Sequence, residues 1–355
     1  MINPKFLKIN PIEQSETIPS SWYQSPEIFD IEKERIFSIS WQLVGAESVI
    51  PNPGDSLIAD IGNNPIMVVR QSDKSIKAFF NVCQHRGGPL LRKNGCNKTL
   101  QCKYHGWVYD LNGTLKKTRE FDGVENFTKN DYNLKPIRID VWMGLIFVNL
   151  SNQAPELSKH LSGITSRIAP IDFSKYSYHS RESYAVQCNW KVYMDNFLEG
   201  YHIPFVHPQL NEVMDYKSYR TELSDQYSLQ WCPLDSELSP YGKTDLGDDT
   251  AYYFTVFPNI LLNIAPGRIQ TNIIEPKSPL SCTIHFDYFF TNPNDAQIEK
   301  DFEFSNLVQK EDIQICEDVQ KGLTSKGYDT GRISVQSESG LYHFQSLIKQ
   351  YLSNG

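Results

Sequence analysis

Two short pairs of cysteine and histidine in the first half of the chain could hold one metal centre. The first pair is Cys83-x-His85 and the second is Cys102-x-x-His105, with residues 86–101 between them. Two thiolates and two imidazoles suit either a tetrahedral zinc ion or a two-iron, two-sulfur cluster in which histidines replace cysteines on one iron. Zinc ribbons usually combine pairs of like residues. Because each pair here is mixed, the cluster is the favoured hypothesis and structural zinc is the alternative.

A second group of metal-binding residue types follows later in the chain, as Glu199-x-x-His202 and then His207. Residues three or four apart share one face of a helix, so Asp195 joins this face. Pro204 is expected to end the helix, which places His207 in the following turn. Two imidazoles and one carboxylate from elsewhere would form the facial triad of non-haem Fe(II) sites, which keeps positions open for O2.

The missing carboxylate can be sought by helical periodicity. In the helix predicted over 306–323, Val308, Ile315 and Val319 form an apolar stripe, and Asp312 lies on it. An ionised aspartate on a buried face is costly unless it is paired or binds a metal. We therefore predict Asp312 as the third ligand, with an ion pair to a core Arg or Lys as the alternative.

Other chemistry at this second group is more restricted. A di-iron carboxylate bundle needs two Glu-x-x-His motifs, whereas the sequence contains a single one, at Glu199–His202. Asn196 lies one residue from the shared helix face and could hydrogen-bond near the iron, with a surface position as the alternative. The pocket is expected to come from the C-terminal sheet, with these candidate residues: Tyr193, Phe205, Trp231, Tyr252, Phe254, Asn263 and Phe286.

We call the two cysteine–histidine pairs the first constellation, and the group around Glu199, His202 and His207 the second. The first constellation lies in a region that the sequence predicts to be all-β. From Trp41 to about residue 150 the hydrophobic pattern has a period of two. Hairpins are predicted within 65–82, at Asn112-Gly113 and within 137–150, because each pairs β-rich runs around a turn sequence.

The second half mixes the periods of strands and helices, which predicts an α+β domain. We expect residues 1–40 to form a helical segment that packs on the catalytic domain, 41–152 to form the β domain and 153–355 to form the α+β catalytic domain. Strands are predicted at 176–187, 251–276 and 281–290, and helices at 189–201, 306–323 and 340–352.

Composition narrows the classes of protein. The chain has 355 residues and a net charge of −8, which argues against nucleic acid or an anionic membrane as the main partner. It holds no run of about 18 apolar residues. Seven cysteines are few and odd in number, which favours reduced thiols and a cytoplasmic location over a disulfide scaffold. The dinucleotide fingerprint Gly-x-Gly-x-x-Gly is absent, so a separate reductase is expected to bind the nicotinamide or flavin.

The first constellation resembles the Rieske domain of the Rieske non-haem iron oxygenases, large subunit, in its four ligands and its flanking glycines. This resemblance implies that Cys83 and Cys102 bind one iron and that His85 and His105 bind the outer iron of a [2Fe-2S] cluster. It also implies the fold class: α+β, with an all-β Rieske domain and a catalytic domain whose antiparallel sheet grips helices.

The second constellation resembles the mononuclear Fe(II) site of the same family, with His202, His207 and Asp312 as ligands. By the same resemblance, Glu199 is the carboxylate that joins His105 of a neighbouring chain to His202. Aromatic-ring dioxygenases have Asp at this place. A Glu resembles the branch that oxidises trimethylammonium compounds, the choline and carnitine monooxygenases. Asp195 is the other candidate for the bridge, and Asn196 completes the predicted catalytic set.

The family resemblance implies an oxygenase that hydroxylates or oxidatively demethylates or cleaves a small quaternary ammonium compound. Electrons would come from NAD(P)H through a separate reductase of the flavin or ferredoxin type, and the expected assembly is a homotrimer or a multiple of it. No nucleic-acid or membrane partner is expected. Two alternatives remain open from the residues: an aromatic-ring dioxygenase, and an electron-transfer or zinc-stabilised binding protein without catalytic iron.

Overall fold

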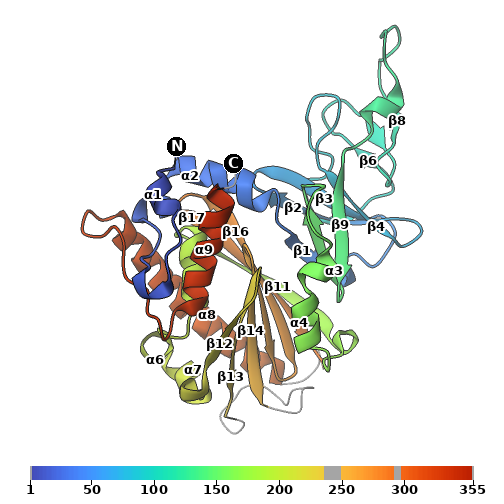
Figure 1. Ribbon diagram of the computed structural model, residues 1–355. Helices are drawn as coiled ribbons and strands as arrows, with labels where there is room; N and C mark the ends of the chain where they lie inside the picture. The colour runs from blue at the N-terminus through green and yellow to red at the C-terminus, as the bar shows by residue number, and fades with distance from the viewer. Residues whose placement is uncertain (1, 236–248, 292–296, 354–355) are drawn as a thin grey trace. The chain divides into compact units, whose positions relative to one another are not determined.

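The computed structural model of the chain describes residues 2–235, 249–291 and 297–353. The chain forms two compact units: residues 37–158 in one, and residues 1–36 together with 159–355 in the other (Figure 1). The second boundary lies six residues later than the expected 152/153. The reason is local, because the Trp41 indole donates to the carbonyl of Pro155 at 2.9 Å and Arg138 pairs with Glu156 at 2.6 Å.

The smaller unit is all-β. A seven-stranded antiparallel sheet has the order β1-β10-β9-β4-β3-β2-β5, and a three-stranded sheet has the order β6-β7-β8. The strands are β1 (Gln42–Ala46), β2 (Asp55–Ile61), β3 (Asn64–Arg70), β4 (Ile76–Phe80), β5 (Gly95–Cys96), β6 (Leu100–Gln101), β7 (Val108–Tyr109), β8 (Leu115–Lys117), β9 (Pro136–Trp142) and β10 (Leu145–Asn149).

The predicted hairpins are present in this unit, and their turns explain them. β3 pairs with β4, β7 with β8 and β9 with β10. The turn between β9 and β10 is Met143-Gly144, and both residues have positive φ (50° and 77°), as a tight two-residue hairpin requires. At Gly113, φ is +88° and a Cβ atom would lie 2.6 Å from the Phe79 ring, so the turn needs glycine.

The larger unit is built on one seven-stranded antiparallel sheet of order β11-β17-β16-β15-β14-β13-β12. The α+β prediction is confirmed here. The strands are β11 (Ser177–Val186), β12 (Arg220–Leu223), β13 (Tyr227–Pro233), β14 (Thr250–Val256), β15 (Ile260–Ala265), β16 (Arg268–Ser278) and β17 (Ser281–Phe290).

Helices lie against this sheet (Figure 1). Among them, α5 packs on β16 and α9 packs on β12. Those of this unit are α1 (Pro4–Leu7), α2 (Pro26–Glu32), α4 (Ser162–Arg167), α5 (Trp190–Phe197), α6 (Ile203–Val206), α7 (Pro208–Val213), α8 (Gln297–Thr324) and α9 (Ser339–Ser353), while α3 (Leu157–His160) spans the boundary. In the described part of the chain, no helix is both long and apolar enough to cross a membrane.

The N-terminal segment is fastened to α5 by a buried ion pair. Glu32 of α2 lies 2.6 Å from the Lys191 ammonium, and both side chains are fully buried. The Trp190 indole donates to the other Glu32 oxygen at 2.9 Å. Removing one partner of such a pair costs about 3–5 kcal/mol, because the other charge stays buried without compensation. The segment therefore helps to hold the helix that precedes the second constellation.

The buried face of α8 differs from the predicted apolar stripe. Val319 is 45% exposed, so it does not belong to the core. The helix instead buries a row of mostly polar or thiol side chains: Asp301, Ser305, Gln309, Cys316 and Gln320. Asp312 lies on this row, three residues after Gln309 and four before Cys316. The prediction that Asp312 lies on an inward face was correct. The stripe used to define that face was only partly correct, because Val319 is exposed.

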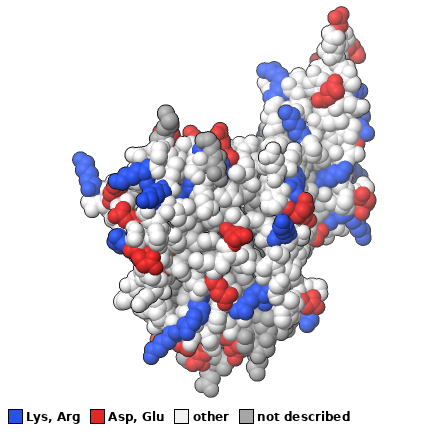
Figure 2. All heavy atoms as spheres, in the orientation of Figure 1, with Lys and Arg blue, Asp and Glu red and all other residues white. Residues whose placement is uncertain are grey.

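Charges of both signs are interspersed among the described residues on the face shown in Figure 2. Neither sign dominates that face, as expected for a chain with a modest net charge of −8.

Candidate active site

The two cysteine–histidine loops of the β unit share one backbone geometry. The Gly87 amide donates to the Cys83 carbonyl at 2.9 Å, and the Gly106 amide donates to the Cys102 carbonyl at 3.0 Å. Both glycines have positive φ, +72° and +76°, which a side chain would strain. The chain therefore turns in the same way after each cysteine.

The four side chains of these loops are arranged as a cluster site requires. Cys83 and Cys102 are 1% and 2% exposed, whereas His85 and His105 are only partly buried and their rings lie 4.7 Å apart. Trp107 stacks on His85 at 4.8 Å. Among the described residues, the buried Nδ1 of His85 has no hydrogen-bond partner. Burial and then neighbouring positive charges lower the pKa of His85, which favours the neutral imidazole that binds a metal. These residues fit a [2Fe-2S] cluster with an inner cysteine iron and an outer histidine iron.

The backbone around the second constellation departs from the predicted continuous helix. Asn189 caps α5 by accepting a hydrogen bond from the Lys191 amide at 3.0 Å, and α5 already ends at Phe197. Pro204 does not end this helix but stands in the first turn of α6, where proline is favoured. His202 and His207 flank α6 as its caps, so a four-residue helix sets their separation.

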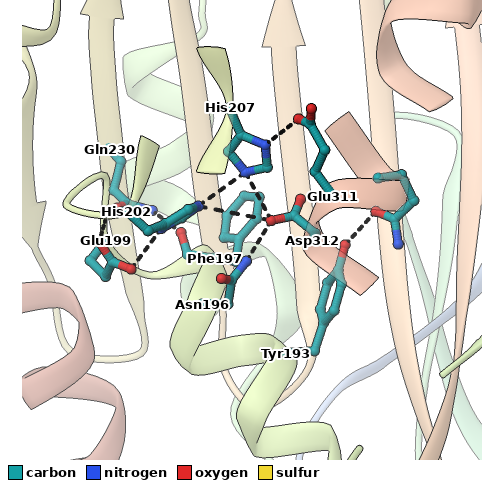
Figure 3. A network of polar contacts seen from close by, with 10 residues as sticks. Tyr193, Asn196, Phe197, Glu199, His202, His207, Gln230, Glu311 and Asp312 are labelled. Atoms are coloured by element: carbon teal, nitrogen blue, oxygen red, sulfur yellow. Dashed lines mark hydrogen bonds and ion pairs between the residues drawn. The ribbon is translucent and has the colours of Figure 1, made fainter. Parts of the chain in front are cut away.

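Three side chains from two parts of the chain converge on one point (Figure 3). His207 Nε2 lies 3.2 Å from His202 Nε2 and 3.1 Å from Asp312 Oδ1, and the remaining separation is 3.8 Å. Ligands bound about 2.1 Å from a metal and at right angles are about 3 Å apart. The geometry therefore fits a facial triad of two histidines and one carboxylate, a donor set that suits non-haem Fe(II).

Each histidine of the triad is held by a carboxylate on its far side. Glu199 lies 2.7 Å from Nδ1 of His202, and Glu311 lies 2.8 Å from Nδ1 of His207. Burial lowers the pKa of His207, but its hydrogen bond and charge interaction with Asp312, and then those with Glu311, outweigh burial and raise it. The surroundings are thus negative and favour a cation. The sequence analysis did not predict a role for Glu311. The one feature of the sequence that pointed to it was its position next to Asp312.

The two other predicted catalytic residues have different surroundings. Asn196 donates to Oδ1 of Asp312 at 2.6 Å, which places it at the triad. Asp195 is turned away: its Oδ2 accepts hydrogen bonds from Tyr23 at 2.5 Å and from Gln345 at 3.2 Å. Burial raises the pKa of Asp195 to about 7, although these hydrogen bonds act in the opposite direction. The structure brings Asn196 and Glu199 to the metal ligands and does not bring Asp195 there.

A cavity of about 120 Å³ adjoins the triad and lies between α5, α8 and the sheet. Of the predicted pocket residues, Tyr193, Asn263 and Phe286 line it. The prediction that Phe205 lines the pocket is wrong, because its side chain is 83% exposed. The cavity is not lined by Trp231, Tyr252 or Phe254 either. The aromatic residues that do line the cavity are Tyr193, Phe197, Tyr219, Tyr253, Phe286 and Phe304.

Comparison with known proteins agrees with both halves of this description. Residues 40–128 match the Rieske [2Fe-2S] domain, and residues 173–354 match the ring hydroxylating alpha subunit (catalytic domain). The chain belongs to the Rieske-type ring-hydroxylating oxygenases. This Rieske oxygenase has its cysteine–histidine loops within the first matched range and its triad within the second.

Relatives of this Rieske oxygenase include plant and bacterial monooxygenases. It is 35% identical to choline monooxygenase of Arabidopsis thaliana over 96% of this chain and 84% of that protein. It is 32% identical to the carnitine monooxygenase oxygenase subunit of Acinetobacter baumannii over 94% of each. The structure of the quaternary ammonium Rieske monooxygenase CntA with γ-butyrobetaine has a TM-score of 0.86 and 28% identity, covering 99% of both chains.

These findings confirm the predicted family, fold class and cofactors. This Rieske oxygenase is an enzyme that uses a Rieske [2Fe-2S] cluster and a mononuclear non-haem iron. The alternative of an electron-transfer or zinc-stabilised binding protein is therefore wrong. Naphthalene 1,2-dioxygenase, at 20% identity and a TM-score of 0.78, shares the fold.

Proposed function

We propose that this Rieske oxygenase hydroxylates a small quaternary ammonium compound in the cavity beside the triad. The observation that carries the proposal is the aromatic wall of that cavity, to which six aromatic residues contribute. A quaternary ammonium group cannot donate hydrogen bonds, and aromatic faces attract it through cation–π contacts. The carboxylates of Glu199 and Asp312 also line the cavity and add negative charge. The named relatives that oxidise choline or carnitine support the same class of substrate.

The iron ligands in this proposal are His202, His207 and Asp312. Iron bound there supplies the activation of O2 for oxygen insertion into a substrate C–H bond. The chain contributes orientation, because Asn196 holds Oδ1 of Asp312 and Glu311 holds the His207 ring. Partners of this kind fix the histidine tautomer and the direction of each ligand, and their loss typically lowers metal affinity or activity 10- to 100-fold.

Electron delivery completes the proposal. Cys83, Cys102, His85 and His105 would hold the Rieske cluster, and its electrons would come from NAD(P)H through a separate flavin- or ferredoxin-type reductase. Glu199, already bonded to His202, joins it to His105 of a neighbouring subunit in a homotrimer or a multiple of one. Inter-subunit electron transfer in a solved quaternary ammonium Rieske monooxygenase, 29% identical to this chain, supports this arrangement.

The test is O2 uptake coupled to product formation, with reductase and NADH, across choline, carnitine, glycine betaine and benzoate. We expect uptake with quaternary ammonium compounds and none with the aromatic acid. Uptake with benzoate alone would contradict the proposal. His207→Ala should abolish turnover and keep the visible spectrum of the cluster. His285→Ala is the matched control, because His285 lies on β17 of the same unit and contacts Glu275 and Ser183 instead of the triad.

A further inference from the structure

A row of polar side chains crosses the inner face of the catalytic sheet at the cavity. Gln230 of β13 pairs in register with Tyr253 of β14, Tyr253 with Asn263 of β15, and Asn263 with Gln270 of β16. Residues paired directly across antiparallel strands point to the same face. All four line the cavity. The row thus places two adjacent amides, Asn263 and Gln270, and a third across Tyr253 on a sheet face where apolar side chains would be expected.

Within this row, one amide lacks its partner. Gln230 accepts a hydrogen bond from the Tyr219 hydroxyl at 2.8 Å, and Gln270 donates to Asn272 at 2.7 Å. Asn263 lies between them and is 5% exposed, yet its Oδ1 has no hydrogen-bond partner among the described residues. A buried acceptor left without a donor is destabilising, because it has given up its hydrogen bonds to water without replacing them. Asn263 is therefore placed to accept a hydrogen bond from a ligand in the cavity.

A second amide on the cavity wall, that of Gln309, has a donor without an acceptor in the described part of the chain. Gln309 lies on α8, one turn before Asp312, and is 2% exposed. Its Oε1 accepts a hydrogen bond from the Tyr193 hydroxyl at 2.7 Å, an interaction drawn at the right of Figure 3. Its Nε2 is buried and has no acceptor among the described residues. The bond from Tyr193 fixes the amide so that the nitrogen is its unused end.

We propose that Asn263 and Gln309 bind the hydroxyl group of the substrate, so that this oxygenase selects a quaternary ammonium alcohol. The inference rests on the proposed function and names the substrate class within it. A hydroxyl donates one hydrogen bond and accepts others, which matches one free amide acceptor and one free amide donor. A carboxylate can only accept, so it would repel the Asn263 oxygen.

The charge at the cavity wall also favours a neutral group over a carboxylate. Arg268 is the arginine among the lining residues, and its guanidinium lies 2.7 Å from Asp301, with both side chains 5% exposed. Asp301 is therefore already in contact with the guanidinium as a counter-charge. A substrate carboxylate would compete with Asp301 for that charge, whereas a hydroxyl needs only the two amides.

Binding to the metal-loaded enzyme, measured by calorimetry, tests this with two matched cations. Choline carries the hydroxyl, and ethyltrimethylammonium has the same cationic end without it. We expect the wild type to bind choline on the order of tenfold to a hundredfold more tightly, as one or two net hydrogen bonds allow. In Asn263→Leu and in Gln309→Met, affinity for choline should fall toward that for ethyltrimethylammonium, whose own affinity changes little.

Thr271→Val is the matched control. Thr271 lies between Gln270 and Asn272 on β16, so it faces the other side of the sheet, and it too buries a hydroxyl without a partner. The exchange is close in volume, and the preference for choline should survive it. A role of Asn263 in folding alone would move both affinities together and would overturn the proposal.

The remaining outcomes are separable. If the wild type binds both cations equally, hydroxyl recognition is wrong although the quaternary ammonium function stands. If glycine betaine binds more tightly than choline and Asn263→Leu removes that preference, the group recognised is a carboxylate and the alcohol class is wrong. If no quaternary ammonium cation binds or supports O2 uptake, the proposed function fails as well. Should one variant not fold, the other variant and the wild-type affinity ratio still decide the question.

Discussion

Glu199 holds His202 at two points. One carboxylate oxygen accepts a hydrogen bond from the His202 backbone amide at 3.0 Å, and the other lies 2.7 Å from its Nδ1 (Figure 3). A histidine hydrogen-bonded through Nδ1 presents the lone pair of Nε2 to a metal. Because α5 has already ended at Phe197, this double contact rather than a helix fixes the His202 ring. Glu199 is therefore a positioning residue within its own chain, in addition to any role between subunits.

Replacing Glu199 by Gln tests this role. At saturating Fe(II) we expect turnover to fall by about 100-fold, because a neutral amide holds the imidazole more weakly, while the cluster remains loaded. Iron content, O2 uptake and the rate at which the reduced cluster is reoxidised in a single turnover should be measured together. The exposed Glu212→Gln is the control. Turnover within twofold of wild type would show that the Glu199 carboxylate is not needed to position His202.

Glu311→Gln should weaken iron binding more than it changes the cluster. Glu311 lies 2.8 Å from Nδ1 of His207, and the loss of such a partner typically costs 10- to 100-fold in metal affinity or activity. Iron retained after dialysis against a chelator, compared with acid-labile sulfide, separates the two centres. Asp318→Asn on the exposed face of α8 should leave both unchanged. Unaltered iron retention in the Glu311 variant would count against its role.

Gly88→Ala should disturb the Rieske cluster. A Cβ atom at this position would lie 3.1 Å from the Cys102 sulfur and 3.3 Å from Cβ of Tyr104, so the two cysteine–histidine loops would have to separate. Overpacking of this kind costs about 1–3 kcal/mol. We expect less cluster per chain, measured by visible absorption and sulfide content. Gly95→Ala meets no atom within 4 Å and should load normally; equal loading of the two variants would show that the loops tolerate the extra carbon.

Asp195→Asn should change how stability depends on pH. Burial raises the pKa of Asp195 to about 7, whereas an unfolded aspartate has a pKa of about 3.9. Between these values the folded state keeps a proton that the unfolded state releases. This contribution to stability is therefore complete below about pH 4 and is lost as the pH rises through 7, by about 2.5 kcal/mol between pH 5 and 8.

The free energy of unfolding, measured by urea titration at pH 5 and pH 8, checks this expectation. The wild type should lose stability relative to Asp195→Asn over this range, because asparagine does not titrate. The exposed Asp329→Asn should behave as wild type. Parallel pH profiles for wild type and Asp195→Asn would mean that Asp195 is ionised across the whole range.

Local patterns were predictable because short-range rules decide them. The hairpin between β9 and β10 follows from a turn at Met143-Gly144, and the cysteine–histidine loops follow from spacing and glycines. The helix through 189–201 was predicted too long. Its periodicity continues past Phe197, but the chain turns away there, and a Cβ at Gly200 would lie 2.8 Å from the Tyr219 ring. Contacts between distant segments overrode the local pattern.

By itself, the sequence determined the chemistry of this protein: two mixed cysteine–histidine pairs for a cluster and two histidines with a distant aspartate for a single iron. It also indicated Asn196, Glu199 and Asn263 near the iron ligands. Only the tertiary structure decided the places of Glu311 and Gln309. Glu311 reaches His207, and Gln309 and Asn263 line one cavity, because α8 lies over a sheet whose strands are in a particular register. A buried polar helix face leaves no hydrophobic period to read, and cross-strand register depends on residues far apart in the chain.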